Sequence, residues 1–159
     1  MPRFYHSQRG FTLLELLVVM VIAGIMLGVV SLNSMPDQRQ RLQNDARRIA
    51  LLMQLARDEA IVRNSPVAFD ADQDRYRFLV RNGNVWEPLT EEMLREREFV
   101  MAPILATVQP QSVSPQSSMY MLRIVFGREP VDRPFALMLT SGDSSVVIRA
   151  DGIGHFEVD

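Results

Sequence analysis

The sequence predicts an α+β chain in which a long N-terminal helix precedes an antiparallel β-sandwich-like head of two sheets. Apolar residues gather between Phe11 and Val30, and the fifteen residues from Leu16 onward carry no charge. After Pro66, short β-branched and aromatic runs alternate with Gly, Asn and Asp turn residues. The 159 residues have room for one such head and one helical appendage.

The first predicted element is a membrane-spanning helix over residues 11–32. From Phe11 to Val30 it would be about 30 Å long at about 1.5 Å per residue, which matches the apolar core of a bilayer. Residues 1–10 carry two arginines and no acid, so the positive-inside bias would keep this end in the cytoplasm. A signal peptide cleaved after the apolar run is disfavoured, because no A-x-A-like site follows. An uncleaved anchor and processing before the run both stay open.

Glu15 is the carboxylate inside this apolar run. An ionised carboxylate in hydrocarbon costs about 2.5 to 3.5 kcal/mol, so it normally has a partner or a function. Arg9 stands six residues earlier, which is not a helical neighbour spacing, and a cut after Gly10 would remove it. The sequence therefore suggests a partner on another molecule. The alternative is that Glu15 snorkels to the lipid headgroups.

The stretch RGFTLLELLVVMVIAG resembles the processing motif of type IV pilins and type II secretion pseudopilins. In that family a short basic leader ends in Gly, Phe usually follows, and Glu stands fifth in the mature chain. Gly10, Phe11 and Glu15 match these positions. The resemblance implies that a prepilin peptidase cuts between Gly10 and Phe11 and methylates the new amino terminus of Phe11. It also implies that Glu15 pairs with the Phe11 amine of a neighbouring subunit during assembly.

Residues 33–64 are predicted to form an amphipathic stem helix that follows a kink or break at Pro36. Apolar residues recur there at spacings of three and four, as one helix face requires. They are Leu42, Ala46, Ile49, Met53, Ala56 and Ala60, with Leu52 and Leu55 widening the stripe. The end of this helix and the residues after it, LLMQLARDEAIVRNSPVAF, resemble the H-type minor pseudopilins and the related FimT pilins.

Residues 65–159 are predicted to form the β-rich head. Its candidate strands are Val67–Phe69, Tyr76–Val80, Val85–Trp86, Phe99–Met101, Ile104–Val108, Met119–Phe126, Phe135–Thr140, Ser145–Ala150 and Ile153–Val158. Hairpin turns are predicted at Asn82-Gly83, Ser141-Gly142-Asp143 and Asp151-Gly152. Two polar segments, 109–118 and 127–134, are predicted loops.

Composition excludes several kinds of chemistry. The chain has no cysteine and all 17 basic residues are arginine, so it has no disulfide, thiolate zinc site, cysteine nucleophile or Schiff-base lysine. No cofactor site is expected, and Trp86 is predicted to fill a gap in the core. His155 is predicted to lie in a strand and to share a face with Ile153 and Glu157, with no paired nucleophile. We therefore expect no catalytic residue.

The acidic run DADQD deserves a separate test for metal binding. Asp70, Asp72 and Asp74 have the alternating spacing of the first ligands in an EF-hand loop. Arg75 and Arg81 occupy the positions where such a loop needs glycine and a bidentate glutamate. The run is therefore predicted to be an acidic hairpin tip, and no metal site is expected.

The resemblance implies a structural protein and not an enzyme. It points to a minor pseudopilin of the type II secretion system, a subunit of the periplasmic pseudopilus that drives secretion of folded proteins across the outer membrane. H-type members are thought to join the tip complex to the shaft. The protein would be a single-pass inner-membrane protein of a Gram-negative bacterium, with its C-terminal head in the periplasm.

Its implied partners are the prepilin peptidase, other minor and major pseudopilins, and inner-membrane lipid before assembly, with the secretin and secreted substrates as further candidates. The alternative is a FimT-like minor pilin of a type IV pilus that acts in pilus initiation or DNA uptake. The net charge of −2 falls to −4 once residues 1–10 are removed, because 15 basic residues then face 19 acidic ones. This balance disfavours nucleic acid as a partner. A membrane-anchored periplasmic enzyme ranks third.

Overall fold

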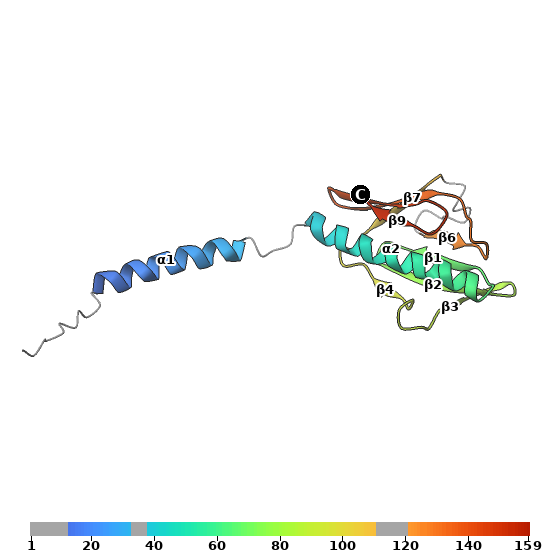
Figure 1. Cartoon of the computed structure of the whole chain (residues 1–159), viewed down its shortest axis with the longest axis horizontal. Helices are drawn as coiled ribbons and strands as arrows, with labels where there is room; N and C mark the ends of the chain where they lie inside the picture. The colour runs from blue at the N-terminus through green and yellow to red at the C-terminus, as the bar shows by residue number, and fades with distance from the viewer. Residues whose placement is uncertain (1–12, 33–37, 111–120) are drawn as a thin grey trace, which may run out of the picture. The chain divides into compact units, whose positions relative to one another are not determined.

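The chain divides into two units, Met1–Pro36 and Asp37–Asp159. The computed structural model describes residues 13–32, 38–110 and 121–159 (Figure 1). The first unit contains helix α1, Leu13–Leu32, and the second begins with helix α2, Gln38–Val62. The strands described in the second unit are β1 Val67–Ala71, β2 Arg75–Asn82, β3 Val85–Pro88, β4 Arg97–Glu98, β5 Leu105–Gln109, β6 Leu122–Phe126, β7 Phe135–Ser141, β8 Ser144–Ala150 and β9 Phe156–Val158.

Both helices lie where the sequence predicts them. The predicted break at Pro36 falls within residues 33–37, which lie outside the described residues. In α2 the predicted apolar stripe is confirmed, because its six main members are completely buried: Leu42, Ala46, Ile49, Met53, Ala56 and Ala60. Of the two residues expected to widen the stripe, Leu52 is buried and Leu55 is partly buried.

Two antiparallel sheets form the head, as the sequence predicts. Sheet A has the order β3-β2-β1-β6, with β4 pairing to the far end of β2, and sheet B has the order β5-β7-β8-β9. Helix α2 contacts β1 of sheet A and both β8 and β9 of sheet B, and Figure 1 shows it running alongside both sheets. The apolar stripe of α2 is therefore covered by two sheets at once.

Strand alternation explains which residues form the core between these layers. The inner side of sheet A carries Phe69, Tyr76 and Phe78, whose rings contact one another, and Tyr76 also contacts Phe99. Burying one such large side chain contributes about 1.5 to 3 kcal/mol. Sheet B adds Leu137, Leu139, Val146 and Ile148 to the same cluster. One continuous core thus joins α2 to both sheets.

Turn glycines define two of the three predicted hairpins. Gly83 between β2 and β3 and Gly142 between β7 and β8 have φ values of 59° and 54°, a left-handed region that glycine adopts without strain. The third predicted turn, Asp151-Gly152, is instead the start of a longer connection over residues 151–155. The predicted loop 127–134 separates β6 from β7, whereas most of 109–118 lies outside the described residues.

The strand predicted over Phe99–Met101 is wrong, because the backbone there serves other partners. The N–H of Phe99 donates to the carbonyl of Asp74, and the N–H of Val100 donates to the side chain of Asp45. The strand in this region is the short β4, which ends at Glu98. The other strands agree with the predicted ranges apart from their ends, and Met119 of the β6 prediction lies outside the described residues.

Candidate functional site

The predicted processing and assembly motif leads into α1. Gly10 and Phe11 lie outside the described residues, so cleavage and methylation there stay predictions. Glu15 lies in the first turn of α1 and is the helix's charged residue. A carboxylate at this end interacts favourably with the helix dipole by about 0.3 to 1 kcal/mol. The dipole of α1 therefore favours a carboxylate at this position.

The described side chains of α1, residues 13–26, are all exposed. The exposed fraction is 81% for Leu13, 76% for Met20 and 62% for Ile25. In the part of the chain that the structure describes, no helix meets the length and apolarity needed to cross a membrane.

In the head, Asp45 joins α2 to the connection between β4 and β5. The carboxylate is buried, and its Oδ2 accepts a hydrogen bond of 3.0 Å from the Val100 N–H. Desolvation raises the pKa of Asp45, against the lowering effects of this hydrogen bond and of Arg48. Nearby, burial and the charge of Asp45 raise the pKa of the Tyr76 hydroxyl. Asp45 thus holds the β4–β5 connection against α2, and its burial costs the solvation of the carboxylate.

Arg57 joins the other end of α2 to two loops. Its side chain is only 11% exposed, and its Nη2 donates to the carbonyl of Pro130. A Cβ on Gly154 would lie 2.7 Å from Arg57 Nη1, so glycine leaves space for the guanidinium. The φ of Gly154 is +117°, which L side chains rarely adopt. Arg57 therefore positions the loops 127–134 and 151–155 beside the helix.

The prediction that His155 lies in a strand is wrong. Asp151 Oδ1 accepts hydrogen bonds from the N–H groups of Ile153, Gly154 and His155, which close the chain into a loop. Asp151 Oδ2 lies 2.9 Å from His155 Nδ1. Desolvation alone would raise the pKa of Asp151, but the hydrogen bonds from Ile153 and His155 outweigh it and lower that pKa to about 2. His155 is thus an exposed partner of a loop carboxylate.

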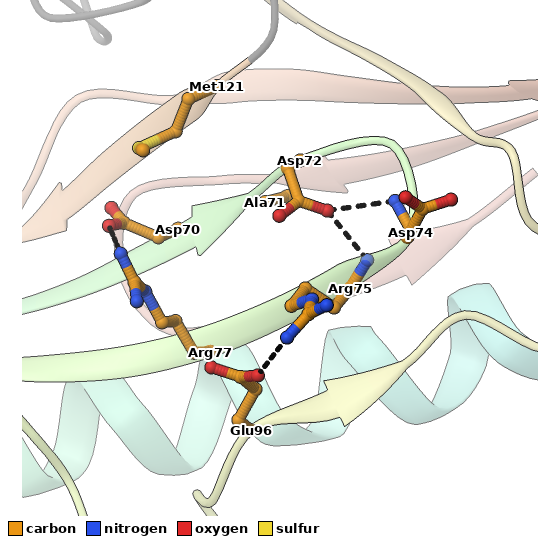
Figure 2. Close-up of a pocket in the computed structure, with 8 residues that line it drawn as sticks. All are labelled: Asp70, Ala71, Asp72, Asp74, Arg75, Arg77, Glu96 and Met121. Atoms are coloured by element: carbon orange, nitrogen blue, oxygen red, sulfur yellow. Dashed lines mark hydrogen bonds and ion pairs between the residues drawn. The ribbon is translucent and has the colours of Figure 1, made fainter.

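A hollow of about 240 Å³ lies where β1 turns into β2 (Figure 2). Within it, Asp72 Oδ1 accepts hydrogen bonds from the N–H groups of Asp74 and Arg75, both at 2.8 Å. Arg75 Nη1 donates to Glu96 Oε1 at 2.9 Å. Asp72 and Asp74 therefore lie in the predicted turn. Within residues 13–32, 38–110 and 121–159, no three or more His, Cys, Asp or Glu side chains are grouped to hold a metal ion.

Asp70, which the sequence assigns to the same acidic tip, lies instead inside β1 and is 2% exposed. The strand register places Arg77 of β2 and Arg123 of β6 directly opposite it. Arg123 donates through Nε and Nη2 to the two carboxylate oxygens, each at 2.6 Å. Arg77 Nη2 lies 3.6 Å from Oδ2. The bidentate hydrogen bond to Asp70 raises the pKa of Arg123.

Trp86 does not fill the core, contrary to prediction. It lies opposite Arg81 in the β2–β3 register, on the face of sheet A turned away from α2, and is partly exposed. The guanidinium carbons of Arg123 and Arg81 lie 5.3 Å and 6.0 Å from its ring centroid, within cation–π range. The alternation of β2, β3 and β6 could have indicated that these residues lie on the outer face of their strands. Their pairing depends on register, which the sequence does not display.

Comparisons with known proteins find family matches in both units of the chain. A family model described as the prokaryotic N-terminal methylation motif matches residues 5–31, and a model described as type II transport protein GspH matches residues 45–154. The type II secretion system protein H of Pseudomonas aeruginosa is 28% identical over 143 residues, which cover 88% of this chain and 80% of that protein.

One solved structure shows the same fold. The solution structure of E. coli GspH matches with a TM-score of 0.57 and 18% identity, over 76% of this chain and 89% of that one. The minor pseudopilin EpsH from the type 2 secretion system of Vibrio cholerae matches with a TM-score of 0.48 and 15% identity, over 72% and 94% of the two chains. Since the GspH model spans more than half of the sequence, this chain belongs to the GspH family of type II transport proteins.

Proposed function

We propose that this minor pseudopilin links the tip complex of the pseudopilus to its shaft. In this role residues 1–10 are a leader, residues 11–32 anchor the chain in the inner membrane, and the head lies in the periplasm. One observation carries the proposal: a single chain matches the methylation motif over 5–31 and GspH over 45–154. The protein acts as a structural subunit and not as an enzyme.

The chemistry of α1 supports assembly through this helix. Its described side chains present apolar surface on all sides, which lipid can cover before assembly and neighbouring helices can cover afterwards. Cleavage between Gly10 and Phe11 would create a cationic amine near Glu15. Pairing of Glu15 with the Phe11 amine of a neighbour would be strengthened by the low dielectric and would favour one axial stagger.

Replacing Glu15 by Val tests this pairing. The variant should still be inserted and processed, but its copurification with other pseudopilins should fall about tenfold, as the loss of about 1.4 kcal/mol implies. Quantitative mass spectrometry of cross-linked membranes measures this ratio. Glu157→Gln, which removes a carboxylate from the head, is the matched control. Undiminished copurification of the Glu15→Val variant would contradict the pairing.

Replacing Gly10 by Leu tests processing. A side chain before the cut should obstruct the extended backbone in the peptidase cleft, so the leader should stay attached. Intact-mass measurement of the membrane protein distinguishes the two forms. Gly24→Ala is the control, because a Cβ at Gly24 would meet no atom within 4 Å. A mature mass for the Gly10→Leu variant would refute the assigned cleavage site.

The linking role itself is tested by deletion and cross-linking in the source bacterium. Loss of the gene should stop secretion of folded proteins, and the complemented head should form cross-links to minor and to major pseudopilins. Intact secretion accompanied by loss of a type IV pilus would overturn the assignment in favour of a minor pilin. Cross-links to major subunits alone would overturn the position between tip and shaft.

A further inference from the structure

The outer face of sheet A, which is turned away from α2, carries an unusual group of side chains. Strand alternation places Arg77 and Arg81 of β2, Trp86 of β3 and Arg123 of β6 on this side. We call these four residues the arginine–tryptophan face. The exposed Val125 of β6 lies on the same side, two residues after Arg123.

Trp86 and Arg123 meet above strands that separate their own strands. In sheet A, β2 and β1 lie between β3 and β6, yet the Arg123 guanidinium is 5.3 Å from the Trp86 ring centroid. Beneath them, Ala68 and Leu79 point to this outer side and are only 0% and 4% exposed. The ring and the arginine stems therefore cover the middle of the sheet. Trp86 itself remains partly exposed above the sheet.

The arginine–tryptophan face carries positive charge, although the chain as a whole is acidic. The face carries three guanidinium groups, and those of Arg81 and Arg123 lie against the Trp86 ring. The carboxylate of Asp70 on this face is buried and bound by Arg123. Arg81 uses its Nε to donate to the carbonyl of Gly83, and the described residues give it no other hydrogen bond. The Arg77 side chain is 39% exposed, and its nearest nitrogen, Nη2, lies as far as 3.6 Å from Asp70 Oδ2. Both arginines thus keep donors available to a partner.

Acidic side chains lie next to the arginine–tryptophan face, at the start of β2. Figure 2 shows Asp72, Asp74 and Glu96 around Arg75, two residues before Arg77. A continuous phosphate backbone that followed the sheet from Trp86 would meet these carboxylates, and nucleic-acid binding relies on many successive phosphate contacts. A short acidic protein segment needs only the arginine end. The charge pattern therefore favours a protein partner.

We propose that the arginine–tryptophan face docks an acidic segment of another protein. Two carboxylates of that segment pair with Arg77 and Arg81, and an apolar side chain between them packs on Trp86 and Val125. Guanidinium groups suit this role because they bind carboxylates through two parallel hydrogen bonds. This docking role is separate from the proposed link between tip and shaft, because binding of the acidic segment requires no filament.

Trp86 also provides the measurement, since it is the only tryptophan in the chain. The full chain in an uncharged detergent is titrated with a blocked eight-residue peptide of six glutamates and two leucines, and Trp86 emission is followed. We expect a saturable change that disappears in about 0.5 M salt, where charges are screened within a few ångströms. The same peptide with glutamine in place of glutamate should cause no change.

The double variant Arg77→Gln/Arg81→Gln should weaken binding at least tenfold, measured by calorimetry because the substitution also alters the surroundings of Trp86. The control is Arg149→Gln, which removes an exposed arginine from the outer face of sheet B and should bind as the wild type does. Circular dichroism verifies that each variant is folded.

Four results would overturn the inference. They are no saturable change with the acidic peptide, an equal response to the glutamine peptide, tighter binding of an oligothymidine strand, and a change in emission with protein concentration alone. The third would indicate a nucleic acid as the occupant, and the fourth a second copy of the chain. None of them depends on secretion or pilus assembly, so they leave the proposed function to its own tests.

Discussion

Helices α1 and α2 are both long, but their side chains have opposite surroundings. In α1 every described side chain is exposed, whereas α2 buries a stripe that begins at Leu42 and ends at Ala60. The difference follows from periodicity: α1 is apolar on all sides, while α2 alternates apolar residues with arginines and acids. A one-sided stripe can be satisfied by the sheets of its own head. An apolar surface on all sides requires lipid or other helices, in agreement with the role proposed for α1.

The largest effect is expected from removing a buried side chain of α2. Ile49→Ala should lower the free energy of unfolding of the head by about 4 kcal/mol, because a completely buried isoleucine is lost and a cavity remains. Ile25→Ala in α1, where the side chain is 62% exposed, should change it by less than about 0.5 kcal/mol. Urea titration followed by Trp86 fluorescence measures both. Equal losses in the two variants would show that the contrast between the helices is wrong.

The next effect concerns a buried ion pair in the head; the described side chains of α1 form no such pair, because all of them are exposed. Among the described residues, Arg123→Ala would leave the buried Asp70 with the more distant Arg77 as its partner, so the head should lose about 3 kcal/mol. Arg149→Ala, which breaks the exposed pair with Asp159, should cost less than about 1 kcal/mol. The same urea titration compares them. A small loss for Arg123→Ala would mean that water or Arg77 compensates Asp70 fully.

The smallest effect is a pH dependence at Asp45 on the inner face of α2. Because the folded-state pKa is raised above 3.8, the native head binds the proton more tightly than the unfolded chain does. Stability from this group is therefore fully present below pH 3.8 and is lost as the pH rises toward the folded-state pKa. Asp45→Asn keeps an oxygen to accept the Val100 N–H and removes this loss.

The stability of the Asp45→Asn variant relative to the wild type should therefore increase from pH 4 to pH 7. Urea midpoints measured at several pH values in this range provide the comparison, with Asp143→Asn on the exposed β7–β8 turn as the control. A difference that stays constant with pH would show that Asp45 pays no desolvation cost.

Much of the fold could be predicted because its signals are local. The stripe from Leu42 to Ala60 repeats within single helical turns, and Gly83 and Gly142 provide the φ values that two hairpins require. The motif around Gly10, Phe11 and Glu15 is also contiguous, and the match over residues 5–31 agrees with it. The sequence by itself thus determined the helices, most strands and the family.

The tertiary structure decided where individual polar side chains lie. Asp70 resembled Asp72 and Asp74 in spacing, but the register with β2 and β6 places it between two arginines inside the head. Trp86 looked like a core residue until its contacts with Arg81 and Arg123 were seen on the outer face of sheet A. The physical reason is the same in each case. A strand's pattern determines which residues share a face, but the register between distant strands determines which side chains meet and which charges are compensated.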